Sequence, residues 1–345
     1  MQNGTVDRKA IVAIIVLLVL LVALAAGLFA FLNSIEFPKS NIWETVTLVF
    51  DWLTTPDEYS PYQILTLDYE IGDAVLRDGW IYFAGLQGNT IRIERMRLDA
   101  SVVETVAEIS GARTMEQIAG FDLALNGTIR LVIRDSGAGG RLLYATYDRA
   151  GNLILERELF APSFFAEDAS INRFITSFLA DGSMVIDGHD EWTCEVFLYF
   201  FGADGTLISR REMTCGTSAL TRGGEVIFNR FPAAAVYELD PVTGVWDRQP
   251  FERNFTLRRL YTATGDSGFD FYIDINRDDG TSLYGFSPGT EELVHLLHWG
   301  ELGFRPGGAD TMIVASDGQV VLFRQNRSNW RTGTFVLALG VQQAV

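Results

Sequence analysis

Lysine is almost absent from this sequence: only Lys9 and Lys39 occur in 345 residues. A P-loop uses a lysine to hold nucleotide phosphates, and Schiff-base chemistry uses a lysine amine. No lysine follows residue 39. Phosphate-cradling ATPases and lysine-based aldol or pyridoxal chemistry are therefore excluded for the main part of the chain.

Histidine is also scarce, with three residues in all. His189 lies in an acidic stretch, and we expect it at the surface. His295 and His298 fall in a predicted strand, where residues three apart point to opposite faces, so we do not expect them to share a metal. We predict no catalytic, cofactor-binding or metal-ligating residues, and no cofactor.

Cysteine occurs twice, at Cys194 and Cys215, which is too few for a zinc site. If Asp204-Gly205 forms a two-residue turn, residues whose numbers add to 409 lie opposite each other, as the two cysteines do. Their Cα atoms would then be about 4.5 Å apart, which suits a disulfide. We predict a structural disulfide; two free thiols are the alternative if a bulge shifts the register.

Positive charge is outweighed by negative charge, and the formal net charge is −17. Because the first nine residues carry a net positive charge, the acidic excess belongs to the rest of the chain. A surface this acidic repels nucleic acid and anionic lipid headgroups. Nucleic acid is therefore excluded as a partner.

One long apolar stretch is present, from Ala10 to Leu32, without a charge, a proline or a polar amide. As a helix it would extend about 34 Å, enough to cross a bilayer. Arg8 and Lys9 precede it, which places the N-terminus in the cytoplasm. We predict an uncleaved single-pass anchor; a signal peptide cleaved near Ala23-Leu24-Ala25 is the alternative.

This anchor divides the chain into four parts. We expect a cytoplasmic N-terminus (1–9), a transmembrane anchor (10–32), a juxtamembrane segment (33–61) and an extracytoplasmic domain (62–345) of a bacterial membrane protein. The membrane is thus one predicted partner, contacted through Ala10 to Leu32.

Two turn signals alternate along the extracytoplasmic domain. The first is an Asp/Asn-Gly type of step at residues 78, 126, 181, 223, 266 and 317, and the second is a hairpin turn near residues 99, 148, 204, 240 and 287. Two hairpins in each unit imply four strands in each unit, and a period of 40 to 55 residues of this kind is typical of a β-propeller.

We therefore predict an all-β protein, a β-propeller of six blades, or of seven if closure adds one. A β-sandwich or two smaller β-domains are the alternatives. Residues 62–69 are expected to complete the last blade. The expected units are 64–109, 114–160, 172–213, 217–251, 256–299 and 302–339.

Two other motifs are discounted. Gly285 to Gly289 matches the G-x-S-x-G nucleophile elbow, but Pro288 lacks the N–H that would act as an oxyanion donor. Asp274 to Gly280 resembles a calcium loop with its glycine one position late, so we expect a solvated acidic hairpin.

The repeated D-G-x-I and D-x-x-G steps resemble β-propellers of the YVTN, NHL or TolB-like type. Asp270 to Leu339 is similar to the propeller-like regions that precede the solute-binding module of some extracellular binding proteins of Gram-positive bacteria. This resemblance implies a cell-surface role in nutrient capture or sensing, and we expect the solute-binding module to be absent.

We expect a binding, interaction or sensing domain whose ligand is a protein, a peptide or a carbohydrate. Trp80, Trp192 and Trp246 are aromatic residues that could stack on sugars. The alternatives are an anchored hydrolase or lyase that uses carboxylates, and a purely structural scaffold. Acidic side chains converging with an arginine at one mouth of the propeller channel would favour the enzyme.

Overall fold

The structure, a computed structural model, describes residues 63–339 apart from some connecting segments. The segments left out are 99–101, 111–114, 136–140, 162–170, 191–195, 214–215, 222–224, 231–234, 240–245, 251–255, 263–267, 278–279, 288–291, 303–310, 317 and 326–332. The predicted anchor, Ala10 to Leu32, lies outside the described residues and stays a prediction. None of the described residues forms a helix that could cross a membrane.

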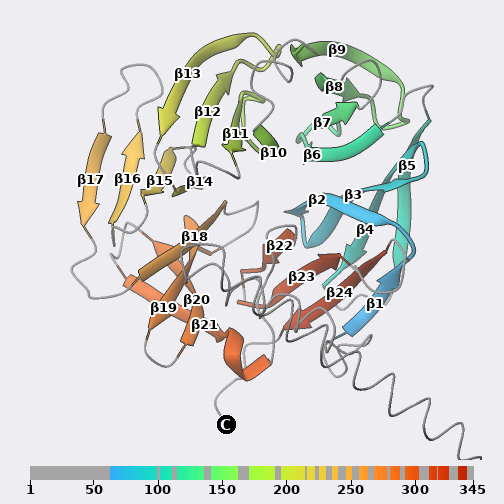
Figure 1. The fold of residues 1–345 in the computed structure, drawn as a ribbon. Helices are drawn as coiled ribbons and strands as arrows, with labels where there is room; N and C mark the ends of the chain where they lie inside the picture. Colours follow the sequence, from blue (N-terminus) through green and yellow to red (C-terminus); the bar gives the residue numbers. More distant parts are fainter. Residues whose placement is uncertain are drawn as a thin grey trace, which may run out of the picture. The chain divides into compact units, whose positions relative to one another are not determined.

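The described residues form six four-stranded antiparallel sheets, which we number as blades 1 to 6 (Figure 1). Blade 1 contains β2 (Glu70–Arg77), β3 (Trp80–Gln87), β4 (Thr90–Arg97) and β5 (Val103–Ser110). Blade 2 contains β6 (Met115–Leu123), β7 (Ile129–Asp135), β8 (Arg141–Tyr147) and β9 (Leu153–Phe160). Blade 3 contains β10 (Ile171–Phe178), β11 (Met184–Asp190), β12 (Val196–Phe201) and β13 (Leu207–Met213).

Blades 4 to 6 continue the same order. Blade 4 contains β14 (Gly216–Leu220), β15 (Val226–Arg230), β16 (Ala235–Leu239) and β17 (Trp246–Pro250). Blade 5 contains β18 (Thr256–Thr262), β19 (Phe271–Arg277), β20 (Gly280–Ser287) and β21 (Glu292–His298), which a 3-10 helix (Trp299–Leu302) follows. Blade 6 contains β22 (Thr311–Val314), β23 (Val320–Gln325), β24 (Thr334–Leu339) and β1 (Gln63–Leu67).

Blade 6 is built from both ends of the described chain. β1 pairs with β24, and Leu67 lies opposite Thr334. The prediction that residues 62–69 complete the last blade is thus confirmed, as are the six four-stranded units.

The hydrophobic core has six parts, each lying between two consecutive blades. For example, Ile93 of blade 1 and Ile133 of blade 2 belong to one buried cluster, and Phe83 of blade 1 and Phe323 of blade 6 belong to another, with ring centroids 5.5 Å apart. A sandwich would have one core between two sheets. The sequence of six interfaces that returns to its start identifies a β-propeller and excludes the sandwich.

Five of the predicted turns share one backbone geometry. In the turn at Asp181-Gly182, the Gly182 N–H donates to Leu179 O and the Leu179 N–H donates to Ser183 O. Gly182 has a φ of +92°, which favours glycine, and the Ser183 N–H donates to the Asp181 carboxylate. The glycine recurs because this three-residue hairpin loop needs a positive φ, and at Asn126, Asp181 and Asp204 the side chain before the glycine accepts the N–H of the residue after it. The other four turns are centred on Gly127, Gly151, Gly205 and Gly318.

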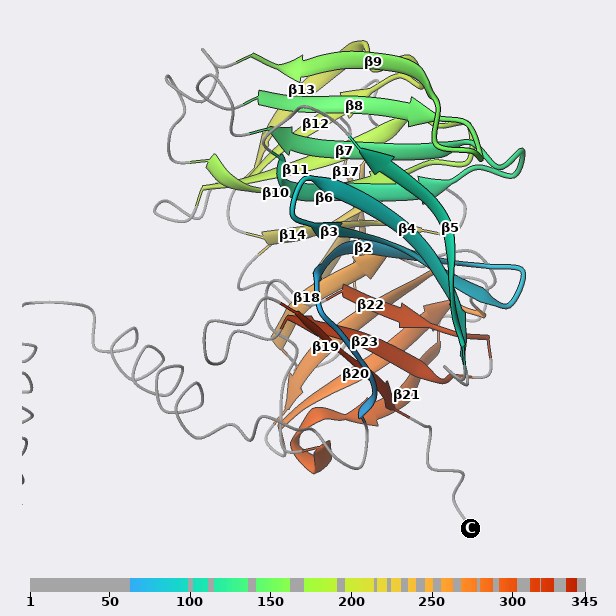
Figure 2. The same cartoon turned by 90° about the vertical axis from the view of Figure 1, so that its right-hand side faces the viewer.

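All these turns lie at one end of the sheets. In an antiparallel blade, the turn between the first two strands and the turn between the last two strands are at the same end. We call this end the turn face; the turns of blades 1 and 2 lie at the right of Figure 2. β1 begins at the turn face, since Gln63 pairs with Leu337 near the end of β24.

The two-residue turn expected at Asp204-Gly205 is wrong, because Gly205 belongs to the longer turn just described. A bulge between β12 and β13 compensates: Phe200 pairs with Ser209, and Val196 pairs with Met213, which restores the predicted register. Cys194 and Cys215 lie outside the described residues, two positions beyond this last pair. Their disulfide therefore stays a prediction.

Replacing both cysteines with serine tests the disulfide. The bond would close a loop of about 20 residues, so we expect the double variant to lose about 3 kcal/mol of unfolding free energy under oxidising conditions. Urea unfolding with and without a reductant measures this loss. If the wild type is equally stable in both conditions, the thiols are free.

Candidate functional site

The innermost strands of the six blades surround the centre of Figure 1. Polar groups on these strands bond from one blade to another. The Phe121 N–H of blade 2 donates to Asp73 Oδ2 of blade 1 at 2.9 Å. The Leu220 N–H of blade 4 donates to Thr262 Oγ1 of blade 5 at 3.1 Å, and Ser177 Oγ of blade 3 lies 3.0 Å from the same oxygen. These contacts link the blades into one frame.

One acid, Asp122, meets two arginines where the inner strands of blades 1 and 2 end, and the charge of Asp122 also acts on a second acid, Asp73 of β2. Arg130 Nη1 donates to Asp122 Oδ2 at 3.0 Å, and Arg77 Nη2 lies 3.7 Å from Asp122 Oδ1. Arg77 also donates to the carbonyl of Leu123. We call Asp73, Arg77, Asp122 and Arg130 the acid–arginine cluster. The cluster combines carboxylates with arginines, the residue types whose convergence would favour a hydrolase or a lyase.

Asp73 is the unusual member of this cluster. Burial, together with a smaller contribution from the negative charge of Asp122, raises the pKa of its carboxyl group to about 7, against the two backbone N–H groups that lower it. Carboxyl groups with a pKa near the working pH are suited to proton transfer. Asp73 is therefore the residue of this cluster that is best suited to donate or accept a proton near neutral pH.

The raised pKa makes stability depend on pH. Between about pH 4 and pH 7, Asp73 holds a proton in the folded state but not in the unfolded state, so stability is full below pH 4 and falls as pH rises through 7. We expect Asp73→Asn to remove about 3 kcal/mol of this fall between pH 4.5 and pH 8. Urea unfolding of the wild type and the variant at pH 4.5 and pH 8 measures this difference. An equal fall of unfolding free energy in both proteins would contradict the raised pKa of Asp73.

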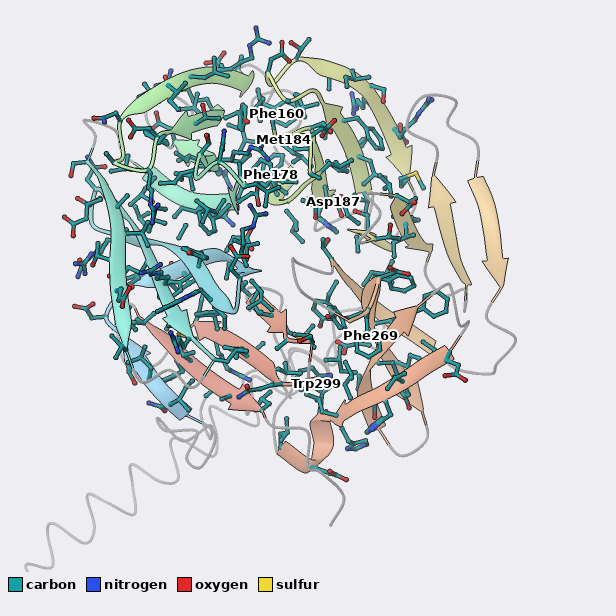
Figure 3. All side chains as sticks on the ribbon, turned by 180° about the vertical axis from the view of Figure 1, so that it is seen from behind. Phe160, Phe178, Met184, Asp187, Phe269 and Trp299 are labelled. Carbon is teal, nitrogen blue, oxygen red and sulfur yellow. The ribbon has the colours of Figure 1, made fainter. Side chains whose placement is uncertain are left out.

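Outside the acid–arginine cluster, the carboxylate of Asp187 in β11 lies between blades 3 and 4 (Figure 3). The Ser218 hydroxyl donates to Asp187 Oδ1 at 2.5 Å, and His189 Nε2 lies 3.9 Å from Asp187 Oδ2. A catalytic serine is activated by a histidine that is in turn oriented by an acid. Here the carboxylate, and not the histidine, accepts the hydrogen bond from the serine hydroxyl, so the contact joins two blades rather than forming a triad.

The expected surface position of His189 is wrong, because only 18% of its side chain is exposed. The residue lies within β11, where it pairs with Val196.

Another buried carboxylate, that of Asp274, is enclosed within blade 5. Asp274 accepts hydrogen bonds from Trp299 Nε1 at 2.8 Å and from the Tyr261 hydroxyl at 2.6 Å. Trp299, which Figure 3 labels, is fully buried. The expectation of a solvated acidic hairpin is therefore wrong for Asp274, since both of its oxygens bond to protein donors.

The expectation that His295 and His298 point to opposite faces of the strand is also wrong. β21 has a bulge between Leu297 and His295, so that His295 pairs with Tyr284 and His298 with Ser282. Residues 282 and 284 point to one side of β20, and so both histidines lie on that side. No cluster of metal-ligating residues occurs among the described residues.

Other motifs also have structural roles. Gly285 to Ser287 belong to β20, where a Cβ on Gly285 would lie 2.6 Å from the Phe269 ring, and Pro288 and Gly289 lie outside the described residues. Trp80 is covered by Arg95 and Arg97, whose guanidinium carbons lie 4.3 and 5.0 Å from its ring centre. Trp192 lies outside the described residues.

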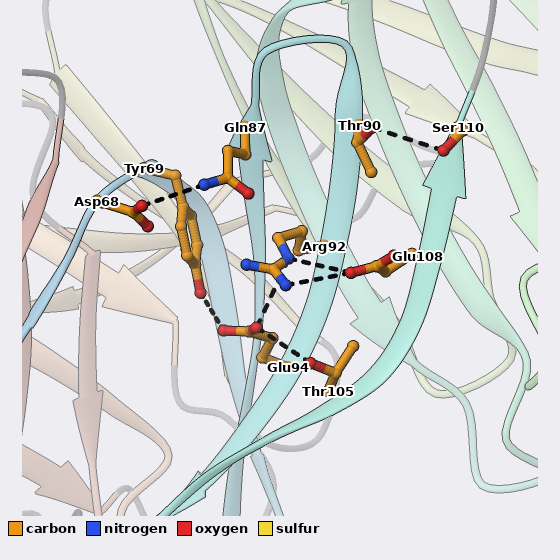
Figure 4. Close-up of polar contacts among 9 residues, drawn as sticks. All are labelled: Asp68, Tyr69, Gln87, Thr90, Arg92, Glu94, Thr105, Glu108 and Ser110. Atoms are coloured by element: carbon orange, nitrogen blue, oxygen red, sulfur yellow. Dashed lines mark hydrogen bonds and ion pairs between the residues drawn. The ribbon is translucent and has the colours of Figure 1, made fainter.

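A separate polar network lies in blade 1 toward the end opposite the turn face (Figure 4). The Tyr69 hydroxyl donates to the buried Glu94 carboxylate, which also accepts from Thr105 Oγ1 at 3.3 Å. Burial raises the pKa of Tyr69, and its bond to Glu94 adds to the effect. Arg92 Nη2 donates to Glu108 at 3.1 Å beside this pair. The network fixes the connection from β1 to β2 against the outer strands.

The sequence analysis did not identify the acid–arginine cluster or the two other carboxylates. Aligning the units on their turns would have indicated two of them, because Asp187 and Asp274 each occupy the fourth position of the second strand of a blade. Asp73 and Asp122 come together only through the packing of blade 1 on blade 2.

Comparison with known proteins finds no family model and no curated protein that matches this chain. Solved structures with a similar fold include a luciferin-regenerating enzyme, at 12% identity and a TM-score of 0.47 over 81% of this chain and 95% of that one. Virginiamycin B lyase from Staphylococcus aureus is similar at 10% identity and a TM-score of 0.43 over 81% and 87%. The β-propeller domain of the Trilobed protease from Pyrococcus furiosus is similar at 11% and 0.43 over 74% and 77%.

The six four-stranded blades of the described residues confirm the propeller fold that the turn signals predicted. The narrower similarity to regions preceding a solute-binding module stays a prediction.

Proposed function

We propose that this chain is a binding or sensing propeller displayed outside a bacterial membrane, to which Ala10 to Leu32 anchors it. The observation that supports a binding role is the bonding of inner-strand polar groups from blade to blade, as between Asp73 and Phe121. A frame of this kind holds its loops and turns in fixed positions, and propeller ligands bind to such surfaces. The ligand would be a protein, a peptide or a carbohydrate, and solute uptake is one process that it would serve.

Protease accessibility tests the display. The full chain, with a tag after Val345, is produced in bacteria, and protease is added to intact spheroplasts. We expect the tagged domain to be digested while a cytoplasmic marker survives. Protection of the tag until the cells are lysed would contradict an extracytoplasmic propeller.

A carboxylate-dependent hydrolase or lyase is the second candidate, and the acid–arginine cluster favours it. Asp73, with a pKa of about 7, would exchange a proton with the substrate, while Arg77 and Arg130 would balance negative charge beside Asp122.

A panel of chromogenic esters, lactones and glycosides tests this second function. We expect any authentic activity to fall at least 100-fold in Asp73→Asn and to persist in Asp204→Asn, which changes an exposed turn carboxylate. Equal activity of the two variants would assign the turnover to another site or to a contaminant.

A further inference from the structure

The exposed large apolar side chains of the described residues are gathered at the turn face. Each one lies within the first three residues of an outermost strand, directly before such a strand, or in the turn between β6 and β7. They are Ile64, Val102, Leu125, Leu153, Ile154, Leu155, Leu207, Ile208 and Val294. Exposed apolar groups that gather in this way mark an interaction surface.

Blades 2 and 3 each expose a leucine-isoleucine pair in the same backbone conformation. Leu153-Ile154 and Leu207-Ile208 each follow a glycine turn of identical hydrogen bonding. In both blades the isoleucine is the unpaired residue of a bulge, which turns it outward. The isoleucines are 61% and 62% exposed.

The strands that carry these two pairs belong to adjacent blades that contact each other at the turn before β13. Arg157 of β9 donates to Thr206 Oγ1 at 2.5 Å and lies 3.4 Å from Asp204, both in the turn that precedes β13. We define the apolar rim as the exposed apolar residues of blades 1 to 3. It comprises Val102, Leu125, Leu153, Ile154, Leu155, Leu207 and Ile208.

The path of the chain indicates what covers this surface. β1 begins at the turn face, and only the 30 residues from Asn33 to Tyr62 separate it from the predicted anchor. A chain of that length with random-coil statistics would span about 30 Å on average. A bilayer would therefore be the surface held closest to the rim, at high effective concentration. The charges around the rim have both signs, as in Arg157 and Asp204, so they do not select anionic lipid.

We propose that the apolar rim rests on a zwitterionic phospholipid bilayer, with Ile154 and Ile208 in its headgroup region; this rests on the proposed membrane display. Apolar contact, and not charge, holds the domain against the lipid. The opposite end of the blades then faces away from the membrane and is open to ligands.

An environment-sensitive probe in the full chain tests this proposal. The full chain is reconstituted in phosphatidylcholine vesicles after NBD labelling of Ile154→Cys, Ile208→Cys or a control, Asn89→Cys, which is exposed in the β3–β4 turn of the opposite end. Wild-type chain treated identically gives the background from Cys194 and Cys215. We expect a blue shift and quenching by spin-labelled lipid at positions 154 and 208, and neither effect at position 89.

The same vesicles separate failure of the docking from failure of the display. Chain that survives an alkaline wash in the vesicle fraction is anchored, so polar emission at position 154 would then overturn the docking alone. Loss of the chain in the wash would instead overturn the proposed anchor. The blue shift could also persist without quenching by spin-labelled lipid and disappear when the protein is diluted in the bilayer. That result would show that the rim contacts a second copy of the chain, and it would overturn the proposal. An additional Leu153→Asp substitution should abolish the shift at position 154.

Discussion

Replacing Gly72 with valine should lower the free energy of unfolding by about 4 kcal/mol, because the new side chain would collide with the next blade. A Cβ at this position would lie 2.4 Å from Ile118 Cβ and 2.6 Å from Ile118 O, where no atom can fit. Gly72 lies at a bulge of β2, which brings that strand onto β6. The substitution would therefore separate blades 1 and 2 along their inner strands.

Gly268→Val is the matched control. Its nearest neighbour would be Ser316 O at 3.6 Å, an ordinary contact, so we expect a change within about 0.5 kcal/mol. Urea denaturation followed by tryptophan fluorescence measures both variants. Equal stability of the two would show that blades 1 and 2 do not approach as closely as described.

Removing the Asp274 carboxylate should cost about 4 kcal/mol of unfolding free energy. Asp274→Ala leaves the Trp299 indole N–H and the Tyr261 hydroxyl without the acceptor they share, and each buried unsatisfied donor costs about 1 to 3 kcal/mol. Since Trp299 is fully buried, water cannot readily replace the lost oxygen. Calorimetry should show a large fall in Tm.

Asp274→Asn separates the hydrogen bonds from other effects. The amide retains one oxygen, so we expect a loss near half of that of the alanine variant. The near-ultraviolet circular dichroism of Trp299 should change in the alanine variant and remain in the asparagine one. If alanine and asparagine cost the same, hydrogen bonding to Asp274 does not account for the stability of this blade.

The fold could be predicted because its signals are local. Asp181-Gly182 and its equivalents specify one hairpin loop each, through a positive φ and a side-chain acceptor, and need no distant partner. Their spacing along the chain then fixes four strands in each blade. The closure of blade 6 by β1 also follows, because a ring of incomplete sheets would leave one edge unpaired.

The candidate site could not be predicted in the same way. Asp73 and Asp122 are 49 positions apart in sequence and belong to different blades, and their proximity depends on the glycine at position 72. Bulges defeated the argument for His295 and His298, because one extra residue changes which face a side chain takes. Alternation alone does not reveal where such a residue is inserted.

The sequence by itself determined the strand number, the turns and the acidic, lysine-poor character of this protein, since each is a property of a few neighbouring residues. Only the tertiary structure decided which carboxylates are buried and which apolar side chains remain exposed. Leu153-Ile154 and Leu207-Ile208 look like core residues in the sequence, but the bulges after their turns direct the isoleucines outward. Burial depends on the packing of whole blades, and no single stretch of sequence contains that information.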